Sequence, residues 1–187
     1  MSLRQGVALG LEEVAWNARL LQMPLSITRT GQEAPPTTAI RIVVANRDDE
    51  REAGEGISIY TCPLKSWRPD AWSVASPESA WTGDQRTDWH HTLATPGAAA
   101  LNARFLRQTG MPMDAEAWRG WMAVKVAFEL AVRGIETDPL ELRFDGHKGS
   151  PLYFSEDGHL VQPTVRMAFG RAELVEAVDA DLLSELH

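Results

Sequence analysis

Apolar side chains recur at helical spacing in several stretches of the chain. This periodicity predicts helices over residues 4–21, 96–108, 114–133 and 172–186. Asp114 is a suitable N-cap for the third helix, because its carboxylate can accept from the first free backbone N–H groups. Gly110 and Gly134 stand where the second and third helices should end. A shorter helical turn is expected over residues 138–142, where Asp138 precedes a proline.

Runs of β-branched and aromatic residues predict the strands. We expect short strands over residues 25–30, 40–45 and 57–62, and a hairpin from residues 152–155 and 160–169. The continuous apolar run at 40–45 is typical of a strand buried on both faces of a parallel sheet. Asp157-Gly158 supplies the residues that tight hairpin turns favour. Residues 31–38 and 47–56 have the composition of loops.

Helical and strand patterns alternate along the chain, which predicts an α/β fold. The chain has 187 residues, so we expect a single domain over residues 1–187. The expected architecture is a three-layer sandwich with a mainly parallel sheet, closed by a C-terminal β-hairpin and a helix. Residues 63–96 are predicted to be irregular, because this stretch is rich in proline and holds Trp67, Trp72, Trp81 and Trp89. These indoles either pin a long loop to the core or line a ligand cleft.

Net charge, hydropathy and cysteine content exclude some classes of partner and an internal disulfide. The formal net charge is −8, from 18 basic and 26 acidic residues, which argues against nucleic acids and anionic membranes as partners. No stretch approaches the roughly 20 apolar residues of a spanning helix, so membrane insertion is not expected. The single cysteine, Cys62, cannot form an internal disulfide and is expected to be a buried thiol.

The candidate catalytic and metal-binding motifs are weak. His90 and His91 are adjacent, so their side chains diverge and cannot easily share one metal. Two Asp-Gly-His triplets, at 145–147 and 157–159, could ligate a cation, but turn chemistry explains them more simply. No nucleophile elbow, phosphate loop or dinucleotide fingerprint is present. We therefore expect no catalytic residues, no metal and no cofactor, with a metal-dependent enzyme built on the triplets as the remote alternative.

Residues 144–154 read Phe-Asp-Gly-His-Lys-Gly-Ser-Pro-Leu-Tyr-Phe, and Asp-Gly-His-Leu-Val-Gln-Pro follows at 157–163. This stretch resembles the closing hairpin of type I periplasmic solute-binding proteins, the Leu/Ile/Val-binding-like proteins of ABC importers. Residues 98–127 resemble the helix pair before that hairpin, and residues 4–14 resemble the first helix more weakly. The ending Gln162-Pro163 is most similar to the subgroup associated with PQQ-dependent alcohol oxidation. Only one of the two lobes of that family is expected here.

The resemblance implies a non-enzymatic module that binds a small organic molecule derived from an amino acid or an alcohol. It implies an ABC permease as partner and a periplasmic location, with the leader outside this sequence; the alternative location is cytoplasmic. The family's ligand contacts do not map onto this chain. We expect any pocket near Tyr60, Trp67, Trp89 and His90, where the aromatics would stack and His90 would offer a polar contact. The alternative function is a reduced lobe that forms a homodimer and binds no small ligand.

Overall fold

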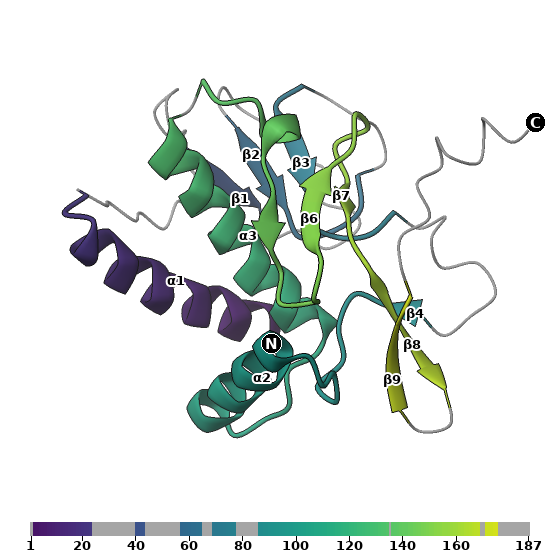
Figure 1. Cartoon of the computed structure of the whole chain (residues 1–187). Helices are drawn as coiled ribbons and strands as arrows, with labels where there is room; N and C mark the ends of the chain where they lie inside the picture. The colour runs from purple at the N-terminus through teal and green to yellow at the C-terminus, as the bar shows by residue number, and fades with distance from the viewer. Residues whose placement is uncertain are drawn as a thin grey trace, which may run out of the picture.

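The computed structural model describes residues 2–23, 40–43, 57–64, 69–77, 86–134, 136–168 and 171–175 (Figure 1). In chain order its elements are α1 Ser2–Leu20, β1 Arg41–Val43, β2 Ser58–Tyr60, β3 Ala71–Ser73, β4 Arg86–Thr87, α2 Pro96–Thr109, α3 Ala115–Arg133, the 3-10 helix η2 Pro139–Glu141, β5 Phe144–Asp145, β6 Pro151–Phe154, β7 Leu160–Val161, β8 Thr164–Ala168 and β9 Arg171–Val175. The predicted α/β class is confirmed.

The three long helices form where local sequence signals predict them. Asp114 caps α3 by accepting a hydrogen bond from the backbone N–H of Ala117 at 2.8 Å, as expected. Thr95 caps α2 in the same way through the N–H of Ala98. Gly110 ends α2 in the left-handed region at φ 73°, a conformation that glycine adopts without steric cost. The short turn predicted at 138–142 is η2.

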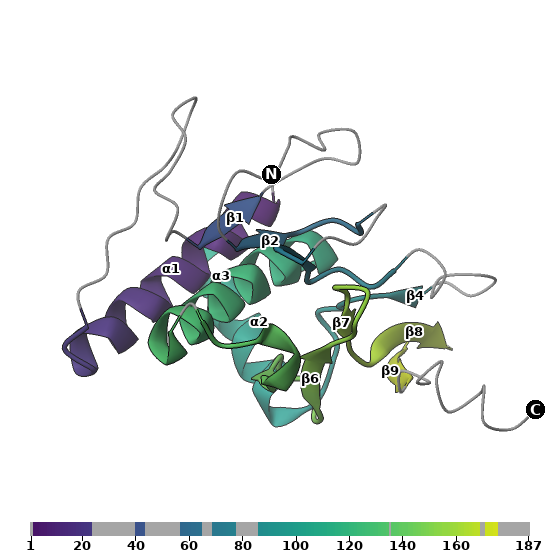
Figure 2. The same cartoon turned by 90° about the horizontal axis from the view of Figure 1, so that it is seen from above.

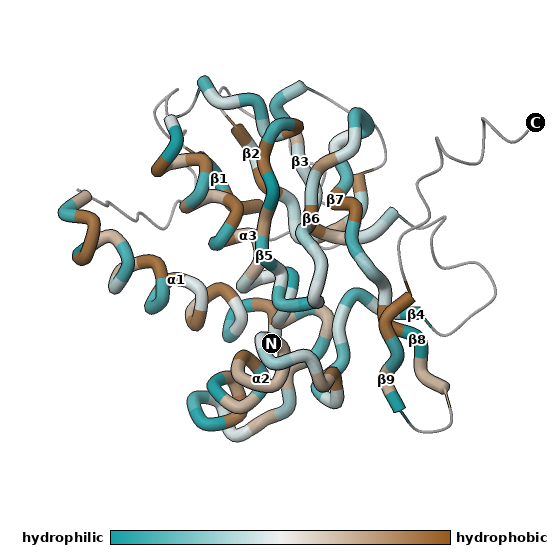
Figure 3. Tube along the Cα trace, viewed as in Figure 1, coloured by the Kyte–Doolittle hydropathy of each residue, from teal (hydrophilic) through white to brown (hydrophobic). Residues whose placement is uncertain are grey.

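Helices α1 and α3 cross at close range, because glycines remove side chains from their contact. A Cβ atom placed on Gly6 would lie 1.8 Å from the carbonyl oxygen of Ala117. A Cβ on Gly120 would lie 2.4 Å from the carbonyl oxygen of Leu3. Polar and apolar positions alternate along α1 (Figure 3), so one side of this helix can pack on α3 while the other faces outward. α3 packs in turn on β1 and β2.

The central sheet combines parallel and antiparallel strands. β1, β2 and β3 are parallel neighbours in that order, with Ile42 opposite Ile59 and Ile59 opposite Trp72. A parallel bridge between Ser73 and His159 places the start of β7 beside β3, and β7, β6 and β5 then pair antiparallel. The closing hairpin therefore extends the parallel sheet.

A second sheet of β4, β8 and β9 lies at the opposite end of the molecule from the C-terminal end of α1 (Figures 1 and 2). The predicted hairpin turn is confirmed, and Gly158 has a φ of 79°. The single strand predicted over 160–169 is wrong, because Gln162 and Pro163 divide it. β7 pairs with β6 before this break, whereas β8 pairs with β4 and β9 after it.

Other expectations need correction. The helix predicted from residue 172 is wrong over its described part, where β9 pairs antiparallel with all of β8. Residues 63–96 contain two short strands, β3 and β4, in place of a wholly irregular segment. The predicted burial of both faces of β1 is wrong, because its three residues are half-buried; among the described strands only β2 pairs with it, so β1 is an edge strand there. The strand predicted at 25–30 and both predicted loops lie outside the described residues.

The main core surrounds α3. Its largest fully buried side chains include Trp89, Trp118, Trp121 and Phe105. Trp89 and Trp118 stack with ring centroids 5.8 Å apart and an interplanar angle of 11°. Phe154 packs between Trp72 and Phe144, and so ties the hairpin to the same core. In the described part of the chain, no helix has the length and apolar character needed to cross a membrane.

Candidate functional site

Buried polar side chains gather where the parallel strands end. Most of the buried polar or charged side chains among the described residues belong to one region. They lie at or just after the carboxyl ends of β2 and β3, or in the hydrogen-bonded network that contacts the segments following these strands: Thr61, Ser73, Ser76, Asp88, Lys148, His159 and Gln162. Ser58, at the start of β2, and Thr164, in β8, are the others. Burying a polar group is unfavourable unless it is hydrogen-bonded, so such a cluster requires an explanation. We call this region the carboxyl edge.

Two hydroxyl groups organise the ends of the strands. The Ser73 hydroxyl donates to the carbonyl oxygen of Cys62 at 2.8 Å and accepts from the N–H of Ala75 at 3.1 Å. The Thr61 hydroxyl lies 3.3 Å from the carbonyl oxygen of Val43 and donates to it. The Val43 carbonyl oxygen also accepts from the backbone N–H of Thr61, so the hydroxyl adds a second hydrogen bond at the end of β1. These hydrogen bonds define the path of the chain as it leaves β2 and β3.

His159 closes this edge from the hairpin. Its Nε2 atom accepts a hydrogen bond from the backbone N–H of Leu64 at 3.2 Å, so the ring proton is on Nδ1 when the imidazole is neutral. Nδ1 lies 3.4 Å from the Asp157 carboxylate, but the geometry does not form a hydrogen bond. Burial opposes ionisation of Asp157, yet hydrogen bonds from Ser155 and from the His159 backbone lower the pKa of its carboxyl group overall.

Behind the edge lies a buried carboxylate, Asp88, which is 0% exposed. Its Oδ2 atom accepts from the Arg119 Nε at 2.6 Å, and its Oδ1 accepts from the backbone N–H of Ser76 at 3.3 Å. Gln162 donates through Nε2 to the carbonyl oxygen of Val74 at 3.1 Å, with Asp88 Oδ1 at 3.4 Å. The segment that follows β3 is thus held by a carboxylate, a guanidinium and an amide.

Lys148 completes this network from the loop between β5 and β6. It is 2% exposed, and its Nζ donates to the Gln162 side-chain oxygen and to the Pro163 carbonyl oxygen, the latter at 2.9 Å. Nζ also lies 4.0 Å from the centroid of the Trp118 ring. Burial lowers the pKa of Lys148 to about 7, with Asp88 opposing the shift and Arg119 adding to it. This amine can therefore take up or release a proton near neutral pH.

The structure describes three of the four residues that we predicted to line a pocket. Tyr60 is the last residue of β2 and is buried. Trp89 is buried against Trp118, and its Nε1 donates to Asn102 Oδ1 at 2.9 Å. His90 is half-buried and its Nδ1 lies 2.8 Å from the Thr92 hydroxyl. Trp67 lies outside the described residues, and ligand contact by these four residues stays a prediction.

His90 also lies against its neighbour. The His90 and His91 rings are 4.3 Å apart between centroids. Burial and then the charge of His91 lower the pKa of His90. The predicted burial of Cys62 is met only in part, because its side chain is half-buried.

Both Asp-Gly-His triplets form turns, as the simpler interpretation predicts. The backbone N–H of His147 donates to Asp145 Oδ1 at 2.8 Å, and that of His159 donates to Asp157 Oδ1 at 3.2 Å. The His159 side chain is buried, however, although turn chemistry alone does not require this. No group of three or more metal-ligating side chains occurs in the part of the chain that the structure describes.

Sequence reasoning missed the roles of Asp88, Lys148 and Gln162. Lys148 and Gln162 belong to the stretch that carries the family resemblance, but no role was assigned to them. The local sequence gives no signal of burial at Lys148, because Asp145, His147 and Ser150 make its surroundings those of an exposed polar turn. Only their contacts identify these residues as one network.

No protein-family model matches the chain, and neither does any curated protein. The chain is similar to a solute-binding protein of an ABC transporter from R. palustris, crystallised in complex with benzoate, with a TM-score of 0.35 and 18% identity over 57% of this chain and 35% of that chain. It is also similar to a leucine-binding protein, LivK, from Thermotoga maritima, with a TM-score of 0.39 and 15% identity over 67% of this chain and 45% of that chain. The chain covers less than half of either solved structure.

Proposed function

We propose that this chain is a non-enzymatic module that binds a small organic molecule at the carboxyl edge. The observation that carries the proposal is the gathering of buried polar side chains behind β2 and β3. In open α/β sheets, ligands bind outside the carboxyl ends of the parallel strands, where the following loops diverge. A small number of well-placed polar groups in an apolar surrounding is also what a binding pocket needs for specificity.

The network supports binding because it holds the edge rigid. Asp88 and Gln162 attach the segment after β3 to α3 and to the hairpin, and the Ser73 hydroxyl ties the end of β3 to Cys62 beyond β2. A site whose supporting side chains are hydrogen-bonded loses little conformational entropy when a ligand binds, so more of the contact energy appears as affinity. Tyr60, Trp67, Trp89 and His90 remain the side chains that we propose to contact the ligand.

The sequence resemblance extends the proposal to a cellular role. The module would be the substrate-binding component of an ABC importer, located in the periplasm and docking on a permease. Its ligand would be derived from an amino acid or an alcohol. Gln162-Pro163 supports the narrower link to PQQ-dependent alcohol oxidation, since these residues carry the resemblance to that subgroup.

A thermal-shift screen against amino acids, short alcohols and their acids tests the proposal. A ligand present at 100 times its Kd should add about 2.7 kcal/mol of apparent stability. The informative variant is Thr61→Val, which removes a hydroxyl just beyond the carboxyl end of β2. Ser58→Ala is the matched control, because Ser58 is buried at the other end of the same strand. We expect the stabilisation to weaken in Thr61→Val and to persist in Ser58→Ala.

A flat response to every organic compound would contradict the proposal. An equal response in both variants would place the ligand elsewhere and would contradict the carboxyl edge as its site.

A second candidate function is a homodimer that binds no small ligand. It is favoured by α1, on which Trp16 and Leu20 are 61% and 62% exposed. These residues are four apart and so share one face of the helix. Light scattering distinguishes the two functions: Leu20→Glu should convert a dimer to a monomer, whereas a monomeric wild-type protein contradicts this second candidate.

A further inference from the structure

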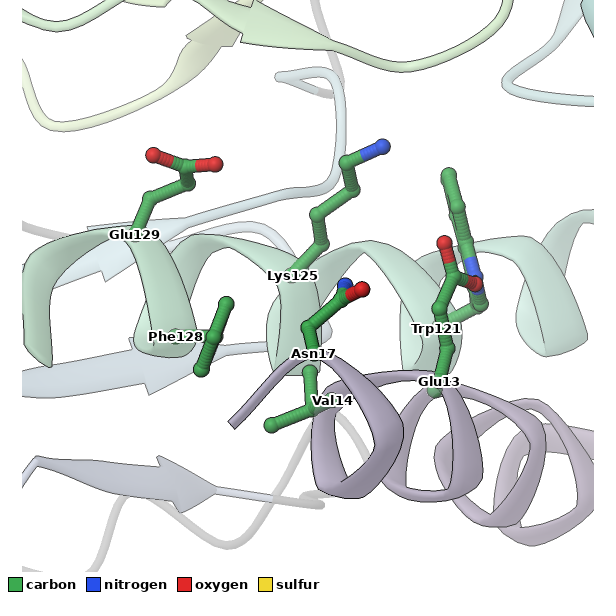
Figure 4. Close-up of a pocket in the computed structure, with 8 residues that line it drawn as sticks. Glu13, Val14, Asn17, Trp121, Lys125, Phe128 and Glu129 are labelled. Carbon is green, nitrogen blue, oxygen red and sulfur yellow. The ribbon is translucent and has the colours of Figure 1, made fainter. Parts of the chain in front are cut away.

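A hollow of about 180 Å³ lies between α1 and α3, and no residue of the carboxyl edge lines it (Figure 4). Its walls combine charged, amide and aromatic side chains: Glu13 and Asn17 from α1, and Trp121, Lys125, Phe128 and Glu129 from α3. Taking about 30 Å³ as the share of one liquid water, the hollow has room for a molecule of about six heavy atoms.

The two carboxylates of the hollow already have cationic partners. Glu13 Oε2 accepts from Arg104 Nη2 at 2.8 Å and from Trp121 Nε1 at 2.9 Å. Glu129 Oε2 lies 3.6 Å from the Nε of Arg133, one helical turn away. Each negative charge is therefore balanced from outside the hollow.

Lys125, in contrast, has no carboxylate within ion-pair distance among the described residues. Its Nζ lies 4.8 Å from the centroid of the Trp121 ring. Asn17 lines the same space from the opposite helix. An ammonium group and an amide donor thus border a space whose apolar walls include the rings of Trp121 and Phe128.

The charge of Lys125 also acts on a second ring that packs on Trp121. The ring centroid of His147 lies 5.1 Å from that of Trp121, and its Nδ1 lies 3.1 Å from Asp145 Oδ2. Burial and then Lys125 lower the pKa of His147, although Asp145 and Glu13 oppose the shift. Lys125 therefore acts on its surroundings as a positive charge, and its field also contributes to lowering the pKa of Asp145.

We propose that this hollow is a second binding site, which takes the carboxylate of a small organic acid. Lys125 Nζ supplies the charge-assisted hydrogen bond, and the Asn17 amide donates a second one. Trp121 and Phe128 pack against the hydrocarbon part of the ligand. A cation is disfavoured in this site, because Lys125 would repel it while Glu13 and Glu129 are held by their own partners.

The test compares three probes of equal length: butanoate, butanamide and butylamine. Titrations followed by the indole N–H signal of Trp121 in ¹H–¹⁵N spectra report binding at this hollow specifically. We expect butanoate to shift the signal in a saturable manner, and both other probes to bind at least about ten-fold more weakly, since the charged hydrogen bond is lost.

Variants then assign the binding to Lys125. Lys125→Met keeps the aliphatic stem over Trp121 and removes the charge, and should weaken butanoate binding at least about ten-fold. Lys125→Arg should retain the binding. Arg107→Met is the matched control, because it removes one positive charge from an exposed position on α2. Circular dichroism confirms that each variant is folded.

Three results would overturn the proposal. The first is an unshifted Trp121 signal at saturating butanoate. The second is binding of butylamine or butanamide as tight as that of butanoate. The third is equal butanoate affinity in wild type and in folded Lys125→Met.

Discussion

The Asp88 carboxylate, fully buried, receives the Arg119 guanidinium at 2.6 Å and joins the segment after β3 to helix α3. Removing one partner of a buried ion pair leaves the other charge poorly compensated in a medium of low dielectric constant. Asp88→Asn should therefore lower the free energy of unfolding by about 3 kcal/mol or more. Urea unfolding followed by tryptophan fluorescence measures this change.

An exposed ion pair in the second sheet serves as the control for the buried pair of Asp88 and Arg119. Arg166 and Glu173 lie 3.3 Å apart, with side chains 45% and 50% exposed. Solvent screens such a pair, so Glu173→Gln should change the free energy of unfolding by about 1 kcal/mol at most. Similar losses in the two variants would mean that burial of Asp88 does not set its contribution.

Lys148 should make stability depend on pH. Its pKa is about 7 in the folded protein and returns toward 10.5 on unfolding. Between these values the unfolded chain holds a proton that the native protein lacks, so the free energy of unfolding rises as pH increases. From pH 7 to pH 9 the gain should be about 2 kcal/mol, and below pH 7 the dependence on pH should flatten, because Lys148 is then protonated in both states and its destabilising contribution is fully present.

Lys148→Met isolates that effect. Urea unfolding of wild type and variant at several pH values gives a difference that should grow in favour of wild type from pH 7 to pH 9. A difference that stays constant with pH would show that Lys148 remains protonated in the native state.

The crossing of α1 and α3 should tolerate no side chain at Gly6. A methyl group there would meet the Ala117 carbonyl oxygen, and the backbones would have to separate. Gly6→Ala should lower the free energy of unfolding by about 2 kcal/mol or more, within the range of overpacked cores. Gly110→Ala is the contrasting change, since its Cβ would meet nothing within 4 Å and only the φ of 73° is strained. We expect this variant to lose about 1 kcal/mol of the free energy of unfolding. Thermal unfolding followed by circular dichroism ranks the two, and an equal or larger loss in Gly110→Ala would contradict the packing argument.

Removing the cap of α3 should cost less stability than the Gly6→Ala change. Asp114→Ala removes the acceptor for the Ala117 N–H and should lower the free energy of unfolding by about 1 kcal/mol. Asp114→Asn keeps a side-chain oxygen and should restore most of that loss. Denaturant midpoints of the two variants provide the check, and equal midpoints would show that the capping hydrogen bond contributes nothing measurable.

Much of the fold follows from signals that act over a few residues. The apolar periodicity of α1, α2 and α3, the Asp114 cap and the Gly110 stop are all readable along the chain, because each depends on neighbours within one or two helical turns. The same holds for the Asp157-Gly158 turn of the hairpin.

The candidate site could not be predicted in this way. Gln162 contacts the carbonyl of Val74 from 88 residues away, and Asp88 contacts Arg119 from 31 residues away. Nothing in the local sequence around Asp88 or Gln162 distinguishes them from exposed polar residues. The same holds for Lys148, which stands in a polar turn sequence and whose partners are decided by how the hairpin meets β3.

The last strand, β9, shows most clearly where local sequence preference and the folded structure disagree. The sequence by itself determined the long helices, their caps and the hairpin turn, because short-range hydrogen bonds and periodic burial decide those elements. Residues 171–175 contain good helix formers, yet they form β9, since β8 offers a complete antiparallel partner and Ala172 and Leu174 pack on the core. Pairing with the preceding strand, together with packing on the core, outweighs a helix preference of a few tenths of a kcal/mol per residue, about what propensity supplies. The tertiary structure alone decided the pairing of β4 with β8, the bridge from Ser73 to His159, and the burial of Lys148 beside Asp88 and Arg119.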